Sequence, residues 1–316
     1  KMFKKKFSLI TIQFLLVITA VFYLIGRANG LNVLLFWPII WSLIFVSFII
    51  VYKLPKRYKL ISLLILTVGI SLIHLVALPK IYHAGRDEIF EAQFASIIAK
   101  EGIWDPTLGK GFAEDYYGRT PALHFLLSFA SLTTGLDSLV LLRYFFFILF
   151  RVIIALFAFL LISTIIKEKN YTISYLATLI FIGSAGTAFA GVTRRSAASI
   201  FVILTIFTIL KAKDHDNKGS WNLLFMFFSL LVVLADRSIS YYFLIFLTGA
   251  WLFSILMRIL KLKEPNMFPD IFPKLIYFII VFSAWIIYSN RIFIRGDVGY
   301  VNKIVEIIFS GTGVKS

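Results

Sequence analysis

The sequence predicts an all-α, polytopic transmembrane helical bundle of about nine spans, with one long extracytoplasmic loop that carries two amphipathic helices. Two observations predict this fold class. The 316 residues are 60% hydrophobic and only 15% charged, and their mean hydropathy is +0.91. A soluble domain has roughly 45–50% apolar and about 25% charged residues. The apolar residues also gather in long runs, which indicates that the solvent around them is lipid.

Crossing a hydrocarbon core of about 30 Å takes roughly 20 apolar residues in a helix. The first apolar run is too long to be only a cleaved signal peptide, and others follow it. The sixth and seventh runs are short and need neighbouring protein around their ends. In the fifth, Gly183 belongs to a group of small residues that favours close helix packing. The runs occupy approximately residues 7–25, 31–52, 60–78, 138–166, 171–190, 196–212, 220–235, 239–257 and 274–289.

Basic residues in the connecting segments predict the orientation. If the runs alternate in direction, the lysine-rich connections all fall on one side, and an excess of lysine marks the cytoplasmic side. This predicts a plasma-membrane protein with a cytoplasmic N-terminus. The net charge of +16 then reflects topology, and we expect no nucleic-acid partner. The basic groups are Lys1 to Lys6, Lys53 to Lys59, Lys167 and Lys169, Lys211 to Lys218, and Arg258 to Lys263.

The predicted chain has four parts. Residues 1–78 form three N-terminal spans, and 79–137 form the extracytoplasmic loop. Residues 138–290 form six further spans, and 291–316 form an extracytoplasmic segment. Whether the chain continues beyond residue 316 stays an open alternative. There is no cysteine in the sequence, which excludes disulfides and thiolate metal sites.

The long loop is acidic, with seven of the chain's sixteen carboxylates within residues 79–120. A first helix is predicted over 88–101, with Asp87 as its N-cap, Glu88 and Glu91 in its first turn and Gly102 at its end. Phe90, Phe94, Ile97 and Ile98 form its apolar stripe. A second helix is predicted over 121–134, with Thr120 as cap, Pro121 at its first position and Gly135 at its end. It is too short to span a membrane.

Two groups of polar residues on the outer face are candidates for ligand contacts. Carboxylates beside aromatic rings are suited to sugar hydroxyls and ring faces, and the loop offers Trp104, Glu114, Asp115, Tyr116 and Tyr117, with His83 before it. The outer charges are mostly arginine, which binds phosphate in a bidentate manner. The candidates for an anion are Arg86, Arg119, Arg194, Arg195 and Arg237. Arg194 and Arg195 lie where a helix is predicted to begin, and a helix N-terminus with two guanidiniums favours an anion.

The order of these parts resembles the GT-C superfamily of membrane glycosyltransferases, which use polyprenyl-phosphate-linked sugars. The resemblance covers roughly residues 80–210 and includes protein O-mannosyltransferases, the aminoarabinose transferase of lipid A and oligosaccharyltransferase. It rests on Gly85-Arg86-Asp87-Glu88, the helix up to Gly102, Tyr116 to Pro121, and the run 138–166 followed by Lys167-Glu168-Lys169. Two features depart from the family. Three spans precede the loop instead of one, and Thr193-Arg194-Arg195-Ser196 stands where the metal-dependent members have a second acidic motif.

The resemblance implies a glycosyltransferase that moves a sugar from a polyprenyl-phosphate donor to a glycan, lipid or protein acceptor on the outer face. Asp87 would be the catalytic base, with Glu88 second, and the outer arginines would hold the phosphate. No cofactor is firmly implied. His74, His83 and His124 are too dispersed for a metal-ligand spacing, although a single divalent ion stays an alternative.

Several alternatives stay open from the residues themselves. Asp87 can be a plain helix cap, and Asp236-Arg237 can be a local ion pair. Arg151, midway along a span, can line a lipid-phosphate groove or bond to backbone carbonyls. For the whole protein, the rival functions are an O-antigen-type polymerase or ligase and a non-enzymatic lipid flippase or transporter.

Overall fold

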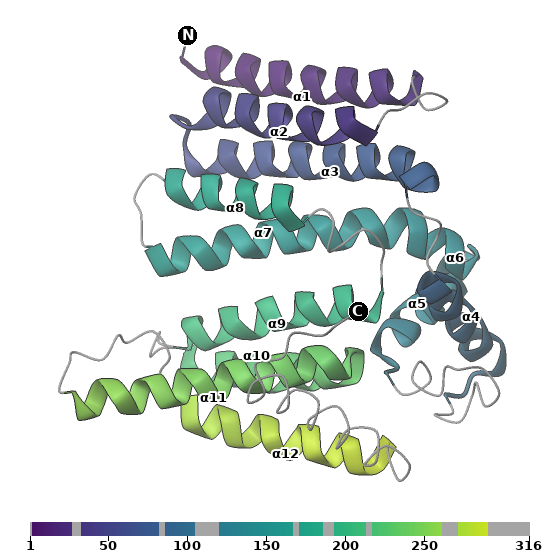
Figure 1. Cartoon of the computed structure of the whole chain (residues 1–316), viewed down its shortest axis with the longest axis vertical. Helices are drawn as coiled ribbons and strands as arrows, with labels where there is room; N and C mark the ends of the chain where they lie inside the picture. Colours follow the sequence, from purple (N-terminus) through teal and green to yellow (C-terminus); the bar gives the residue numbers. More distant parts are fainter. Residues whose placement is uncertain are drawn as a thin grey trace, which may run out of the picture.

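The protein is all-helical in the part of the chain that the structure describes. This computed structural model describes residues 2–26, 33–81, 86–104, 120–166, 171–185, 193–212, 217–260 and 271–289. Within these ranges there is no strand. Helices run back and forth beside one another and form a stack from α1 to α12, with α4 and α5 at one end (Figure 1).

Each predicted apolar run coincides with helix. The fourth run is a continuous rod made of α6, the π-helix η2 and α7, because Asp137 caps its start and no turn interrupts it. The runs correspond to α1 (Met2–Gly26), α2 (Val33–Val51), α3 (Lys56–Ile81), α6 (Ser138–Val140) with η2 (Leu141–Phe146) and α7 (Phe147–Ile166), α8 (Thr172–Ala185), α9 (Arg194–Lys211), α10 (Lys218–Ala235), α11 (Arg237–Ile259) and α12 (Ile271–Ser289).

Five helical segments in the described part are long and apolar enough to cross a membrane. They are Lys56–Leu75, Ser138–Ile166, Lys218–Ala235, Arg237–Ile259 and Ile271–Tyr288. Shorter apolar helices occupy Ser8–Tyr23, Trp37–Val51, Ala122–Thr134 and Thr172–Gly183. Helix α9 falls in neither group, since it carries two arginines in its first turn and a lysine in its last. These apolar helices indicate a multi-pass membrane protein, and nine spans stay a prediction.

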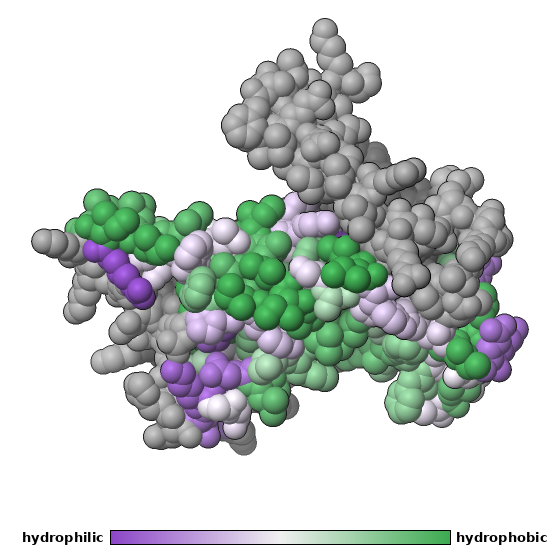
Figure 2. Space-filling view, turned by 90° about the horizontal axis from the view of Figure 1, so that it is seen from below, coloured by the Kyte–Doolittle hydropathy of each residue, from purple (hydrophilic) through white to green (hydrophobic). Residues whose placement is uncertain are grey.

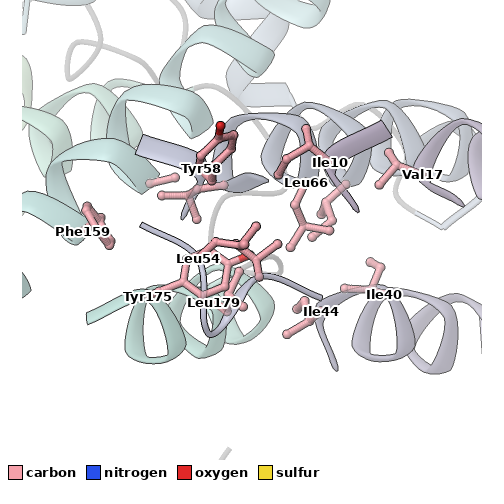
Figure 3. Packing of buried hydrophobic residues seen from close by; sticks show 14 of the residues in the cluster. Ile10, Val17, Ile40, Ile44, Leu54, Tyr58, Leu66, Phe159, Tyr175 and Leu179 are labelled. Atoms are coloured by element: carbon pink, nitrogen blue, oxygen red, sulfur yellow. The ribbon is translucent and has the colours of Figure 1, made fainter. Parts of the chain in front are cut away.

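The helices are held by three apolar clusters. The first joins α1, α2, α3, α7 and α8, and its buried side chains include Leu66, Phe159 and Tyr175 (Figure 3). At Gly183 of α8 an added Cβ would lie 2.7 Å from Ile44 Cδ1 on α2, so the predicted role of this glycine in close packing is confirmed. A second cluster joins α4, α5, η2, α7 and α9, and a third joins α9 to α12.

The outer surface of the stack is apolar. Exposed large side chains include Phe45 on α2, Ile245 on α11 and Ile280 on α12, each at least 60% exposed. Figure 2, seen from the α12 side, shows hydrophobic residues over much of the coloured surface and hydrophilic ones nearer its edges. A soluble protein rarely exposes apolar area on this scale, whereas lipid tails accept it at no cost.

The two predicted loop helices are present as α4 (Arg86–Glu101) and α5 (Ala122–Thr134). Gly102 and Gly135 end them with positive φ values of 68° and 72°, as predicted. The predicted starts need correction. Helix α4 already begins at Arg86, which puts Asp87 inside the first turn. At α5 the N-cap position is Pro121, and the buried Thr120 hydroxyl makes no hydrogen bond among the described residues, so the prediction of a Thr120 cap was wrong.

Candidate functional site

The candidate site lies where α4 and α5 meet α6 and the start of α9, which in turn contacts the start of α11 (Figure 1). Helix α4 has a buried face made by Glu91, Ala92, Phe94, Ala95 and Ile98. This spacing follows the helical period, so a carboxylate lies on the same face as the apolar residues. The predicted stripe included Phe94 and Ile98 correctly, but Glu91 was assigned only to the first turn and not to the buried face, where its side chain is 0% exposed.

Glu91 forms a fully buried pair with His124 of α5. Its Oε2 contacts His124 Nε2, and both side chains are 0% exposed. The carboxylate accepts, so this nitrogen donates. The His124 ring packs on Phe94, 5.5 Å between ring centroids, and its Nδ1 has no hydrogen-bond partner in the described part of the chain. One turn along, Ser128 Oγ donates to the Ala95 carbonyl at 2.7 Å. The Glu91–His124 pair and this hydrogen bond together hold α4 against α5.

The second oxygen of Glu91 ties α4 to the start of α9. Oε1 accepts from the backbone N–H of Arg194 at 3.3 Å. Arg194 is the first residue of α9, and the first N–H groups of a helix have no partner within the helix and attract anions. The sequence predicted an anion at this helix start. In the structure an anion at that position is the protein's own carboxylate, supplied from 103 residues away.

Asp236 pairs with both predicted arginines and so offsets part of their charge. Its Oδ2 lies 3.3 Å from Arg194 Nε and 3.9 Å from Arg195 Nε, while Oδ1 caps α11 by accepting from Ile239 N at 2.9 Å. Arg194 is 5% exposed, whereas Arg195 is 64% exposed. Arg194 is therefore enclosed in the protein, and Arg195 is the member of the pair that a ligand can reach.

A second carboxylate of α4 pairs with the rod that follows the loop. Glu88 Oε2 lies 3.6 Å from Nε of Arg143 in η2, with the two side chains 14% and 34% exposed. The neighbours of Arg143 along η2, Tyr144 and Phe145, are more than half exposed. Glu88 and Glu91 are three residues apart and so lie along the same side of α4. Within one turn, α4 thus presents two carboxylates to basic groups of two other elements.

Aromatic side chains border the site. Trp104, which follows α4, stacks on Trp285 of α12 with ring centroids 5.9 Å apart and lies 6.2 Å from the ring of Phe125 on α5. Trp285 also contacts Tyr288, which is 68% exposed. Of the predicted aromatic ligand contacts, Trp104 is thus part of a larger aromatic group whose other members come from α5 and α12.

Arg151 lies away from this site, inside the bundle. Its Nη1 is 2.8 Å from His74 Nδ1 on α3, and its guanidinium lies 4.2 Å from the Phe147 ring centroid. Because a guanidinium only donates, His74 Nδ1 accepts. The sequence left a backbone carbonyl open as a partner of Arg151, but it did not indicate these two side chains, an imidazole and an aromatic ring.

The described residues include only part of the predicted site. Glu88 pairs with Arg143, whereas Arg194 and Arg195 pair with Asp236, which the partly buried Arg237 directly follows. Outside the described residues lie His83, Glu114, Asp115, Tyr116, Tyr117 and Arg119, together with the side chains of Arg86 and Asp87. No group of three metal-ligating side chains gathers within the described ranges.

Sequence reasoning missed Glu91, His124, Arg143 and Asp236 as members of the site. One signal existed, since Glu91 and His124 each occupy the apolar face of a short amphipathic helix, where a titratable side chain needs a partner.

No protein-family model, curated protein or solved structure matches this chain.

Proposed function

We propose that the protein is a membrane glycosyltransferase that moves a sugar from a polyprenyl-phosphate donor to an acceptor on the outer face. The observation that carries the proposal is the cluster on one turn of α4, where Glu88 and Glu91 meet Arg143 and the start of α9 beside exposed apolar side chains. A donor of this class has a long apolar tail and a phosphate, so it needs a lipid-facing surface next to cationic groups.

The reaction requires a base and a stabilised leaving group. A carboxylate, Asp87 or Glu88, takes the proton of the acceptor hydroxyl as its oxygen attacks the anomeric carbon. The bond between that carbon and the phosphate oxygen breaks, and the lipid phosphate leaves with the bonding electrons. Arg195 and Arg143 are the accessible guanidiniums suited to this negative charge, while Arg194 and Asp236 fix the position of Arg195. Trp104 and its aromatic neighbours offer ring faces to a sugar.

The test is a transfer assay with a radiolabelled polyprenyl-phosphate sugar and the purified full chain. We expect Asp87→Asn or Glu88→Gln to lower transfer by about 10²–10⁴-fold, the range of general-base catalysis. Glu101→Gln is the matched control, because Glu101 is an exposed carboxylate on the same helix, and it should leave transfer unchanged. Full activity in both first variants refutes the catalytic assignment.

Lipid that copurifies with the protein tests the proposal independently. Mass spectrometry should detect a polyprenyl phosphate with the wild type and less of it with Arg143→Ala. Absence of both polyprenyl lipid and sugar transfer would refute the function.

One observation favours a flippase or transporter as the second candidate. The Arg151–His74 pair is a polar group inside the bundle, where transporters bind their substrates. Flipping of a labelled lipid in liposomes that is lost in Arg151→Leu and kept in Glu88→Gln would favour this candidate.

A further inference from the structure

The end of the bundle opposite α4 carries a basic cluster, Lys53, Lys56, Arg57 and Lys59, at the turn between α2 and α3. This turn, the end of α7 and the start of α8 lie on the left of Figure 1, away from α4 and α5. From the sequence, these residues predict only the topology of the chain. Their contacts are more specific than that role requires, because topology depends on the number of charges and not on their geometry.

The three cations of the cluster that are not buried each lie against a tyrosine ring. Lys56 Nζ is 4.4 Å from the ring centroid of Tyr171, which precedes α8, and Lys53 Nζ is 5.2 Å from that of Tyr52. Arg57 Cζ is 4.8 Å from the Tyr58 ring centroid. Such contacts stabilise a cation by about 0.5–1 kcal/mol at exposed sites and restrict its position. The cationic groups are therefore held in place around the turn.

The backbone beneath the cluster is anchored in the core. Leu54 and Tyr58 are buried in the first apolar cluster (Figure 3). Lys59 is 0% exposed and donates to Thr172 Oγ1 at 2.8 Å, and this hydroxyl donates to the Tyr52 carbonyl at 3.1 Å. These bonds join α2, α3 and α8 at one point. Tyr171 adopts φ 55°, an unfavourable conformation for a bulky side chain, which the packing around it maintains.

The described charged residues at this end of the bundle are all basic. In the part of the chain that the structure describes, every carboxylate side chain belongs to α4 or to the residues preceding α6 and α11, at the other end. The first turn of α3 adds the positive end of its helix dipole, since Lys56 and Arg57 begin that helix. An anion at this position would meet several positive groups at once.

The surface next to the cluster is apolar. Ile61 on α3 is 42% exposed, Ile49 on α2 is 51% exposed, and Ile173 on α8 is 55% exposed. These helices contact one another, so their exposed side chains continue from the cations along the bundle. A ligand that fits both regions has a negative head and an apolar tail.

We propose that the basic cluster binds the phosphate headgroup of an anionic phospholipid, with Lys53, Lys56 and Arg57 as phosphate contacts and the acyl chains along α2, α3 and α8. Basic residues at a membrane surface attract anionic lipids with about 1 kcal/mol each. This binding site is independent of the sugar transfer proposed above. If the sequence-based orientation holds, it lies in the cytoplasmic leaflet, where anionic lipids are abundant.

The test is a titration of the full chain in detergent with fluorescent phosphatidylglycerol, and with phosphatidylcholine for comparison. We expect K53A/K56A/R57A to weaken phosphatidylglycerol binding by at least about tenfold, because three contacts are lost. The matched control K211A/K218A/R258A removes the same charge from other helix termini and should change the affinity by less than about threefold. Equal losses in both triple variants would show general surface electrostatics and overturn the proposal, and so would no loss in the first.

Two further measurements complete the test. Inorganic phosphate should weaken lipid binding no more than sodium chloride of the same ionic strength does, and stronger displacement by phosphate would assign the cluster to a soluble phosphate and overturn the lipid assignment. If the triple variant fails to fold, the single variant K53Q replaces it, because this side chain is exposed and its loss leaves the core intact. We then expect about a fivefold weaker affinity, corresponding to one contact, and an unchanged affinity overturns the proposal.

Discussion

Removal of the Glu91 carboxylate should destabilise the protein far more than removal of any exposed carboxylate. Glu91→Ala leaves two buried donors, His124 Nε2 and the Arg194 amide, without their acceptor. Each unsatisfied buried donor costs about 1–3 kcal/mol. With two such donors, we expect the free energy of unfolding to fall by about 2–6 kcal/mol.

Glu91→Gln should lower the free energy of unfolding by less, because glutamine has the shape of glutamate and its one carbonyl oxygen still accepts a hydrogen bond. It replaces the other oxygen with an NH₂ group, which faces a donor. His124 can relieve this conflict only by moving its proton to Nδ1, which has no acceptor in the described part of the chain. We expect the free energy of unfolding of Glu91→Gln to be about 1–3 kcal/mol lower than that of the wild type, which is the cost of one buried unsatisfied group.

Unfolding in detergent mixtures, followed by tryptophan fluorescence, measures these effects, since Trp104 contacts Phe125 of α5. Glu101→Ala is the matched control on the same helix and should lie within about 0.5 kcal/mol of the wild type. The cycle of Glu91→Ala, His124→Ala and the double variant should give a coupling energy of about 1–3 kcal/mol. A midpoint for Glu91→Ala equal to that of Glu101→Ala would refute the reasoning.

Two further predictions concern packing and orientation. Gly183→Ala should lower stability by about 1–3 kcal/mol, because its Cβ meets Ile44 and Trp41 of α2 within 3 Å, whereas Gly249→Ala, with nothing within 4 Å, should be neutral or stabilising. Unfolding midpoints that rank the two variants in the other order contradict the α2–α8 contact. The chain has no cysteine, so single cysteines report topology without background. We expect a membrane-impermeant maleimide to label Leu136→Cys on intact cells and Gly219→Cys only after permeabilisation, and the reverse pattern would invert the orientation.

The helices could be predicted from the sequence, whereas most of the site could not. The apolar runs are local signals, and Gly102 and Gly135 end α4 and α5 where predicted, because a left-handed terminus is a property of a few adjacent residues. The partners of Glu91 are 33 and 103 residues away, and no local pattern indicates which element will supply them.

The arginine pair illustrates the same limit. The sequence correctly puts Arg194 and Arg195 at a helix start, but which of them is accessible depends on Asp236, more than forty positions away, at the start of another helix. Helix propensity carries no information on this burial. The π-helical turn that carries Arg143 was also missed, because the predicted apolar run 138–166 continues through it without a sign of an extra residue.

That π-helical turn has a consequence for comparing this chain with relatives. A π-helix contains one residue more than the α-helical turn it replaces, so η2 amounts to a single-residue insertion in the rod. Deleting one residue there would rotate Asp137 and the preceding segment by about 100° relative to α7. A relative without the π-helical turn should therefore align with this chain through a one-residue gap between positions 141 and 146. In that relative, the residue that corresponds to Arg143 would face a different helix. The carboxylate that pairs with this residue should then lie on an element other than α4.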